Sequence, residues 1–239
     1  MLWMTAFHLC FDLSHLGWIQ QNFYADPFWT WQRTGIVSLF LFAAGFAQAV
    51  AVEQGQDWRR FSQRWVQVSA CAVLVSLGSW LMFPQSWIYF GVLHGLAIML
   101  VLVRWVAVRR MPCGGVAGVG LTLVVLHGLV LQAGLAGWWP EVFNTSSLNW
   151  LGLNWRKPIT DDFVPLVPWM GVVFWGLACG QWMTRSVSAQ AWQTRLQQPL
   201  PAGWRWLGWL GQHSLPYYMF HQPVLIGLLW LWVQMCPPA

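Results

Sequence analysis

The sequence predicts an all-α fold, a polytopic transmembrane helix bundle of about seven spans, and three observations support this fold class. Hydrophobic residues make up 57% of the 239 residues and charged residues only 8%, whereas a soluble domain carries about 25% charged residues. Apolar runs of about 20 residues, the length that crosses a bilayer as a helix, recur along the chain. The chain also contains 22 tryptophans, whose indole rings favour the boundary between lipid and water. We therefore expect residues 1–239 to form a single integral-membrane domain in the lipid bilayer.

Seven apolar segments are the predicted spans. They are residues 1–18, 33–52, 66–83, 88–108, 116–137, 165–183 and 214–235. The first run begins at Met1 without a basic flank, so we interpret it as a shortened membrane helix and not as a secretory signal. The segment 204–212 is amphipathic, which is typical of a helix that lies in the membrane interface.

Basic residues gather in alternate connections, which predicts the orientation of the spans. The basic connections carry Arg59, Arg60 and Arg64 (53–65), Arg104, Arg109 and Arg110 (104–115), and Arg185, Arg195 and Arg205 (184–205). The positive-inside rule places these connections in the cytoplasm, with the N-terminus inside and the C-terminus outside. Since this pattern accounts for the net charge of +5, we expect no nucleic-acid partner.

The first predicted helix carries three ionisable residues on one face. His8, Asp12 and His15 are spaced as i, i+4 and i+7. Asp12 lies one turn from His8 and can accept a hydrogen bond from its ring N–H, which would fix the tautomer and favour the imidazolium. Ionisable residues inside a membrane are costly and usually face a cavity. We therefore favour a functional site over a polar pair that only holds helices together.

Further polar residues in or beside the spans are candidates to bind substrate or a developing oxyanion. They are His15 and Arg33 near the outer ends of the first two spans, His94 in the fourth, Asp161 and Asp162 before the sixth, and His221 in the last. Two simpler interpretations stay open. A helix-end arginine often extends to the interface, and paired aspartates often cap a helix.

Other motifs narrow the function classes. The five cysteines are scattered without a Cys-x-x-Cys pair, so we expect no zinc site, no disulfide framework and no metal. Gly114 and Gly118 form a Gly-x₃-Gly pair at a span boundary, which leaves a homodimer open. The connection 138–164 is rich in tryptophan and asparagine. This composition suits a re-entrant lid or sugar-facing surface and equally suits interfacial anchoring.

Five segments occur together in an order typical of one bacterial family. They are FHLCFDLSHLGW, SLFLFAAGFA, IYFGVLHGLAI, DDFVPLVPWMG and GQHSLPYYMFHQPVL. In these segments the chain resembles the DUF1624 proteins, which are related to the catalytic domain of heparan-α-glucosaminide N-acetyltransferase and to the YeiB-like and acyltransferase-3 membrane proteins. The resemblance covers nearly the whole chain. It implies a multi-pass protein of the bacterial inner (cytoplasmic) membrane that transfers an acyl group from cytoplasmic acetyl-CoA to an acceptor across the membrane.

The chain departs from the family pattern at two points. The Asp-x-x-Arg-Gly motif that opens the first helix in the family is absent. In the animal enzyme the position that corresponds to His8 is an asparagine, and the essential histidine lies further on, towards the outer loop. His15 is the nearest histidine in this chain, but it does not align with that position. The resemblance therefore implies acyl transfer without implying glucosamine as the acceptor.

The residues and the resemblance together give one functional hypothesis, a transmembrane acyltransferase that uses acetyl-CoA or another acyl-CoA and an unknown envelope acceptor. His8 and Asp12 are the expected catalytic pair, with His8 as general base or transient acyl carrier. The expected ligands of the CoA phosphates are Arg59, Arg60, Arg64, Arg109 and Arg110. The alternatives are a small-solute or lipid transporter with a His/Asp proton relay, and a scaffold subunit.

Overall fold

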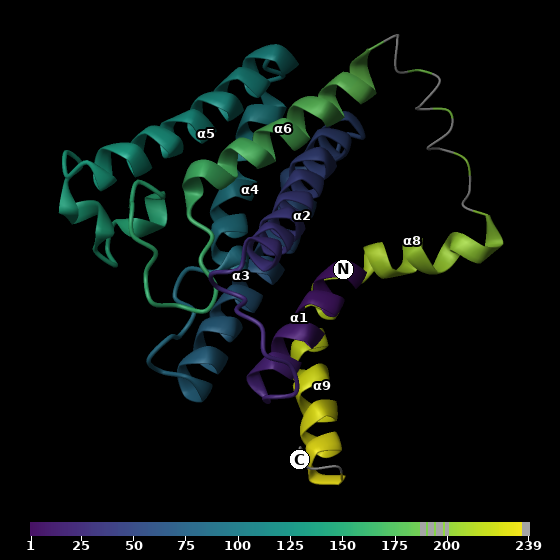
Figure 1. The fold of residues 1–239 in the computed structure, drawn as a ribbon. Coiled ribbons are helices and arrows are strands. Elements are labelled where there is room, and N and C mark those ends of the chain that lie inside the picture. The colour runs from purple at the N-terminus through teal and green to yellow at the C-terminus, as the bar shows by residue number, and fades with distance from the viewer. Residues whose placement is uncertain (187–189, 191–193, 195–197, 199–200, 236–239) are drawn as a thin grey trace. The chain divides into compact units, whose positions relative to one another are not determined.

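The computed structural model describes residues 1–186, 190, 194, 198 and 201–235, and Figure 1 shows helices joined by loops. The helices are α1 (Leu2–His15), α2 (Pro27–Glu53), α3 (Trp58–Met82), α4 (Val92–Val108), α5 (Cys113–Leu135), α6 (Leu166–Arg185), α8 (Arg205–Gln212) and α9 (Ser214–Met235). Each predicted span coincides with one of these helices, and the amphipathic segment 204–212 coincides with α8. The all-α prediction is therefore confirmed. Arg195 and Cys236 lie outside the described residues.

The chain divides into two compact units. Unit 1 comprises Met1–Val37 and Gln198–Ala239, and unit 2 comprises Ser38–Gln197. In unit 1, α1 packs along α9; in unit 2, α6 packs on α5 and on α4, and α3 packs on α4. The first and last predicted spans thus pair with each other within unit 1.

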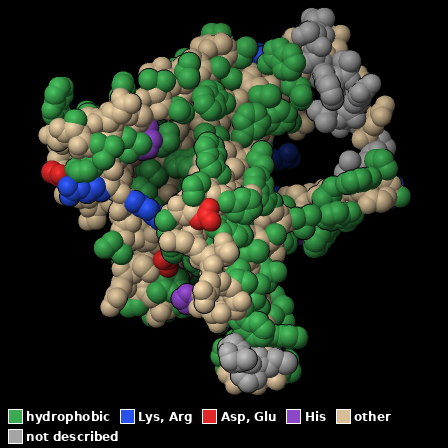
Figure 2. Space-filling view, in the orientation of Figure 1, with side chains coloured by type: hydrophobic (Ala, Val, Ile, Leu, Met, Phe, Trp, Pro, Cys, Tyr) green, Lys and Arg blue, Asp and Glu red, His purple; other side chains and the backbone are tan. Residues whose placement is uncertain are grey.

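Among the residues that the structure describes, four helices, α2, α3, α5 and α6, are long and apolar enough to cross a membrane, and α4 is apolar but shorter. Large apolar side chains point outward from them, as at Leu39 (60% exposed), Leu74 (58%) and Leu129 (57%). Figure 2 shows hydrophobic side chains over much of the visible face, with few charged ones. Water does not solvate so large an apolar surface favourably, so the chain is a membrane protein. Seven spans and their orientation stay predictions.

Both α2 and α3 begin several residues before the apolar runs that predicted them, because polar side chains cap their N-termini. Asp57 Oδ1 accepts a hydrogen bond from the backbone N–H of Arg60 (2.9 Å), and Asp26 Oδ1 accepts one from that of Phe28 (2.8 Å). Such caps satisfy backbone donors that a helix leaves free at its start. The prediction of a loop over 53–65 is therefore wrong in part: the first two turns of α3 carry Arg59, Arg60 and Arg64.

Two glycines let α2 and α6 approach each other closely in unit 2. A Cβ atom on Gly45 would lie 2.0 Å from the carbonyl oxygen of Val173, and one on Gly176 would lie 2.0 Å from that of Phe42. The two backbones are thus in direct contact where the helices cross. Small residues provide such contact in membranes, where association between helices depends on packing.

Candidate functional site

The first helix presents its polar face to the last helix. Within unit 1, α1 lies beside α9 (Figure 1), and the hydroxyl groups of Thr5 and Tyr217 form a hydrogen bond between them. Met4 and Asp12 are the buried residues of α1, while His8 is half-buried and His15 is exposed. The periodicity that placed these ionisable side chains on one face therefore directs Asp12 into the interior of the unit.

The expected hydrogen bond from His8 to Asp12 is absent from the structure, which corrects that prediction. Within the described residues, His8 Nδ1 and Asp12 Oδ2 are each buried without a hydrogen-bond partner. The Asp12 carboxylate instead interacts with the side chain of Gln222 and with His15. The imidazole ring next to His8 is that of His221, with 5.1 Å between the ring centroids and 58° between the ring planes. Spacing along one helix could not reveal a neighbour contributed by α9.

His221 is held in one ring orientation by its own helix. Its Nδ1 lies 2.7 Å from the backbone carbonyl oxygen of Tyr218, so Nδ1 carries the proton of the neutral ring and Nε2 has a free lone pair. The Tyr217 ring lies parallel to the imidazole at 6.0 Å. His221 Nε2 is buried without a partner among the described residues. A lone-pair acceptor is therefore left free beside His8.

A pocket of about 320 Å³ lies where α1 ends. It is lined by Phe11, Ser14, His15, Gln21, Asn22, Phe23 and Tyr24. Hydroxyl, amide and imidazole groups share this lining with aromatic rings, which is typical of a site for a small polar molecule. The structure thus places the predicted substrate residue His15 at a concave site. Arg33, on the part of α2 in unit 1, is half-buried and forms no ion pair with any residue that the structure describes.

His94 belongs to unit 2, where it fixes the start of α4. The backbone N–H of Gly91 donates to His94 Nδ1 (3.3 Å), so Nε2 carries the proton and donates to Ser76 Oγ (3.0 Å). Ser76 Oγ in turn donates to the carbonyl oxygen of Ile88 (2.7 Å). Both ring nitrogens are engaged, and this arrangement joins α3, α4 and the segment between them.

The two aspartates before α6 contact the segment that leads into α4. Asp162 Oδ2 accepts a hydrogen bond from the backbone N–H of Val92 (2.7 Å), and Asp161 Oδ2 accepts one from Ser86 Oγ (3.1 Å). The alternative that these residues act as caps is supported for Asp162, but the helix it caps is α4 and not the adjacent α6. A carboxylate at this position also stabilises the positive end of the helix dipole.

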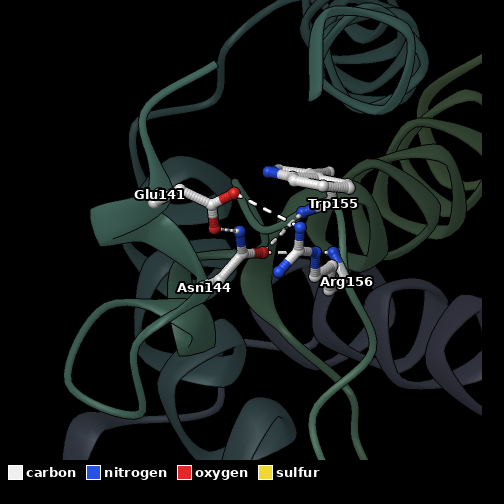
Figure 3. Close-up of polar contacts among 4 residues, drawn as sticks. All are labelled: Glu141, Asn144, Trp155 and Arg156. Carbon is white, nitrogen blue, oxygen red and sulfur yellow. Dashed lines mark hydrogen bonds and ion pairs between the residues drawn. The ribbon is translucent and has the colours of Figure 1, made fainter. Parts of the chain in front are cut away.

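The connection between α5 and α6 is folded through its polar side chains (Figure 3). Asn144 Nδ2 donates to Glu141 (2.8 Å), while Asn144 Oδ1 accepts from the backbone N–H groups of Trp155 (3.2 Å) and Arg156 (3.1 Å). The Arg156 guanidinium forms an ion pair with Glu141 (3.4 Å) and stacks on the Trp155 ring (4.1 Å to its centroid). The Trp155 ring occupies the space beside Gly134 of α5. These contacts give the predicted outer connection a defined fold against α5.

A second contact anchors this connection to the segment before α4. Asn149 is 1% exposed, and its Nδ2 donates to the Tyr89 hydroxyl (2.7 Å). Burial raises the pKa of the Tyr89 phenol, and the hydrogen bond from Asn149 offsets part of this effect because it favours the phenolate. Tyr89 and Asn149 were not among the predicted site residues.

Arg104 was predicted to lie in an inner connection, yet it is buried on α4 and 1% exposed. Its guanidinium donates to the backbone carbonyl and to the side-chain oxygen of Gln56 and lies over the rings of Trp58 (5.5 Å) and Phe61 (5.4 Å). This residue therefore joins the end of α4 to the start of α3. The signal in the sequence was a basic residue within an apolar helical run.

The arginines predicted to bind CoA phosphates lie at one end of the α3–α4 pair. They are Arg59, Arg60 and Arg64 in the first two turns of α3, and Arg109 and Arg110 directly after α4. All five are exposed. The Arg104 contacts bring the start of α3 and the end of α4 together, so these side chains share one end of unit 2. The carboxylate of Asp57, which caps α3, also lies at this end.

The fold and the α1–α9 site define a helical membrane protein in which two adjacent, half-buried histidines lie near a buried carboxylate where α1 packs on α9. The sequence model of the family described as heparan-alpha-glucosaminide N-acetyltransferase, catalytic, matches residues 1–223. The chain belongs to this family, as the order of its motifs predicted. The match extends from α1 into α9 and so includes residues of both units. No curated protein and no solved structure gives a significant match to the chain.

Proposed function

We propose that the protein is a membrane acyltransferase that moves an acetyl or other acyl group from cytoplasmic acyl-CoA to an acceptor in the cell envelope. The observation that carries this proposal is a family match over residues 1–223 that includes the half-buried His8 and the buried Asp12 on α1. The family is described by an N-acetyltransferase activity, and an imidazole with a free nitrogen is the side chain most often used for proton transfer in such chemistry.

His8 is the proposed general base. In direct transfer, His8 takes a proton from the acceptor amine or hydroxyl as that group attacks the thioester carbonyl carbon. The carbon–sulfur bond then breaks, and the CoA thiolate leaves and receives the proton back from His8. In the alternative relay, the unprotonated His8 nitrogen attacks the thioester carbonyl carbon, the carbon–sulfur bond breaks, and the CoA thiolate leaves with the proton from the other ring nitrogen. The acceptor then attacks the acyl-imidazole, the carbon–nitrogen bond breaks, and the acceptor proton returns to His8. Asp12 lies one turn further along α1, and its Oδ2 and His8 Nδ1 have no hydrogen-bond partner among the described residues.

The acyl-CoA phosphates are proposed to bind the five exposed arginines at one end of the α3–α4 pair. A guanidinium group can donate two parallel hydrogen bonds to two oxygens of one phosphate, and it remains charged at every physiological pH. Five exposed cationic side chains at one end of unit 2 suit a polyanionic ligand. The pocket at the end of α1, lined in part by His15, is the proposed entry point of the acceptor.

Seven spans across the bacterial inner membrane complete the proposal. With the N-terminus inside, the starts of α3 and α5 and the ends of α2, α4 and α6 face the cytoplasm, which is where acyl-CoA is available. The loop of Figure 3 and the pocket at the end of α1 then face outward. The distribution of arginines along the sequence supports this orientation.

The proposal is tested by reconstituting the full chain in proteoliposomes and supplying acetyl-CoA labelled in the acetyl group. Amino sugars, glycans and other envelope amines and alcohols are supplied one at a time on the opposite side. The expected result is release of CoA together with label in one acceptor. Neither CoA release nor labelled product with any acceptor would contradict the proposal, and a proton-coupled solute flux in the same vesicles would indicate a transporter.

A further inference from the structure

The α1–α9 interface of unit 1 leaves three buried polar atoms without partners among the described residues. These are His8 Nδ1, Asp12 Oδ2 and His221 Nε2. A buried polar group without a hydrogen bond is destabilising, so a cluster of such groups at one interface needs an explanation. Two of the three atoms are imidazole nitrogens on neighbouring rings.

The spacing of these two rings is that of a hydrogen-bonded pair. An N···N distance of about 2.9 Å, with each nitrogen roughly 1.1 Å from its ring centre, places two hydrogen-bonded imidazoles about 5 Å apart. The ring centroids of His8 and His221 are 5.1 Å apart. His8 Nδ1 and His221 Nε2 are both unpaired in the structure, so a bond between them requires a different orientation of the His8 ring at this same ring spacing.

The tautomer of His221 suits it to accept this bond. Its Nδ1 donates to the carbonyl oxygen of Tyr218 (2.7 Å), so its Nε2 is an acceptor. If His8 donates through Nδ1, its Nε2 keeps the lone pair that a general base needs. Asp12 Oδ2 is the other unpartnered acceptor of this interface, whereas the ring that adjoins His8 is that of His221.

We propose that His221 is the positioning residue for His8, in the role that the sequence pattern assigned to Asp12. Through His221 Nε2, the last helix holds His8 as the Nδ1–H tautomer and directs His8 Nε2 towards the acceptor. A catalytic base is commonly oriented by a third group in this way. The inference rests on the proposed function only for its effect on turnover, since the tautomer is a property of the protein alone.

Two variants separate positioning from packing. His221→Leu fills the space but removes the acceptor, whereas His221→Gln places an amide oxygen near the position of Nε2 and retains it. His213→Leu is the matched control, because His213 is exposed and stacks on Trp209 of α8 at 4.5 Å. All are compared with wild type after reconstitution, at equal monodisperse yield and equal thermal stability.

The first measurement is ¹⁵N NMR of histidine-labelled protein in nanodiscs at pH 8, with His8 assigned by its loss in His8→Gln. Wild type and His221→Gln are expected to show His8 with a protonated Nδ1, and His221→Leu is expected to shift it towards the Nε2–H form. His8 as Nε2–H in wild type, or a tautomer unchanged by His221→Leu, would overturn the inference. This measurement needs no substrate.

The second measurement is acetyl transfer by the same proteins. We expect kcat to fall by about 10- to 100-fold in His221→Leu, since a misdirected base loses its alignment with the reacting group, with KM for acetyl-CoA unchanged. His221→Gln should recover most of kcat, and His213→Leu should match wild type. Equal losses in the Gln and Leu variants would show a packing role and overturn the inference. Absence of transfer in wild type would contradict the proposed function, and the NMR result would then decide the positioning role by itself.

Discussion

The carboxylate of Asp162 accepts a hydrogen bond from the backbone N–H of Val92 at 2.7 Å, across 70 residues of sequence. It thereby caps α4 from the segment that leads into α6. In the same region Thr160 Oγ donates to the carbonyl oxygen of Trp87 (2.9 Å), and the backbone N–H of Val164 donates to the carbonyl oxygen of Phe90 (3.2 Å). The start of α4 is therefore stabilised by a distant part of unit 2.

Replacement of Asp162 by Ala should reduce stability. Loss of a capping carboxylate costs about 0.5–2 kcal/mol, and the substitution also removes negative charge from the start of α4. The measurement is reversible unfolding in mixed micelles. Asp161→Ala is the control, because Asp161 is exposed and accepts only a side-chain hydrogen bond from Ser86 among the bonds described. Equal stability losses at both positions would contradict the capping role.

Replacement of Gly176 by Ala should separate α2 from α6. The added methyl group would meet the Phe42 carbonyl oxygen at 2.0 Å, and overpacking of this kind typically costs about 1–3 kcal/mol. Gly128→Ala on α5 is the matched control, since its Cβ would meet nothing within 4 Å and alanine favours a helix over glycine. The same unfolding assay should show a loss for the first variant and none for the second. A neutral Gly176→Ala would mean that the two helices are further apart.

The Tyr89–Asn149 contact gives a pH-dependent prediction. Burial raises the pKa of the Tyr89 phenol in the folded chain above its ordinary value of about 10. The unfolded chain therefore loses this proton first, so the stabilisation from the phenol is complete below pH 10 and is lost as pH rises through the folded pKa.

Tyr89→Phe should be less stable than wild type by about 1–2 kcal/mol at pH 8, because Asn149 Nδ2 loses its acceptor. The difference should narrow when unfolding is measured at pH 11. A gap that stays constant or widens between these two pH values would be inconsistent with a raised pKa at Tyr89.

The exposed arginines at the start of α3 should determine the affinity for acyl-CoA. Combined replacement of Arg59, Arg60 and Arg64 by Gln is expected to raise KM for acetyl-CoA about tenfold or more, with kcat nearly unchanged, because phosphate contacts distant from the thioester contribute uniform binding. Arg156→Gln, in the loop of Figure 3, is the control. An unchanged KM in the triple variant would place the CoA phosphates elsewhere.

The helical fold was predictable because apolar periodicity is a local property of the sequence. The predicted starts of α2 and α3 lie several residues after the observed ones. Hydrophobicity indicates only the lipid-facing part of a helix and gives no information about capping residues such as Asp57. The contact partners of the site residues were harder to predict from the sequence. The i, i+4 spacing suggested that Asp12 would bind His8, whereas the neighbouring ring is that of His221, more than 200 residues further on.

Other roles depended on contacts between distant segments. Helical periodicity placed Asp12 on one face of the first helix with His8 and His15, and of these three only Asp12 is buried. It could not show that both ring nitrogens of His94 are engaged at the start of α4, or that Arg104 is buried against Trp58 and Phe61. Those contacts arise only when α3 and α4 pack against each other, and a pattern read along a single helix contains no information about them.

The central claim is that His8 performs proton transfer or acyl transfer in a membrane acyltransferase. It is tested most directly by measuring transfer of labelled acetyl groups from acetyl-CoA to an identified acceptor in proteoliposomes that contain His8→Ala, His213→Ala or wild type at equal folded yield. We predict that His8→Ala lowers kcat by about 100-fold or more, as loss of a general base does, while His213→Ala retains wild-type kcat. Wild-type turnover in His8→Ala would contradict the account.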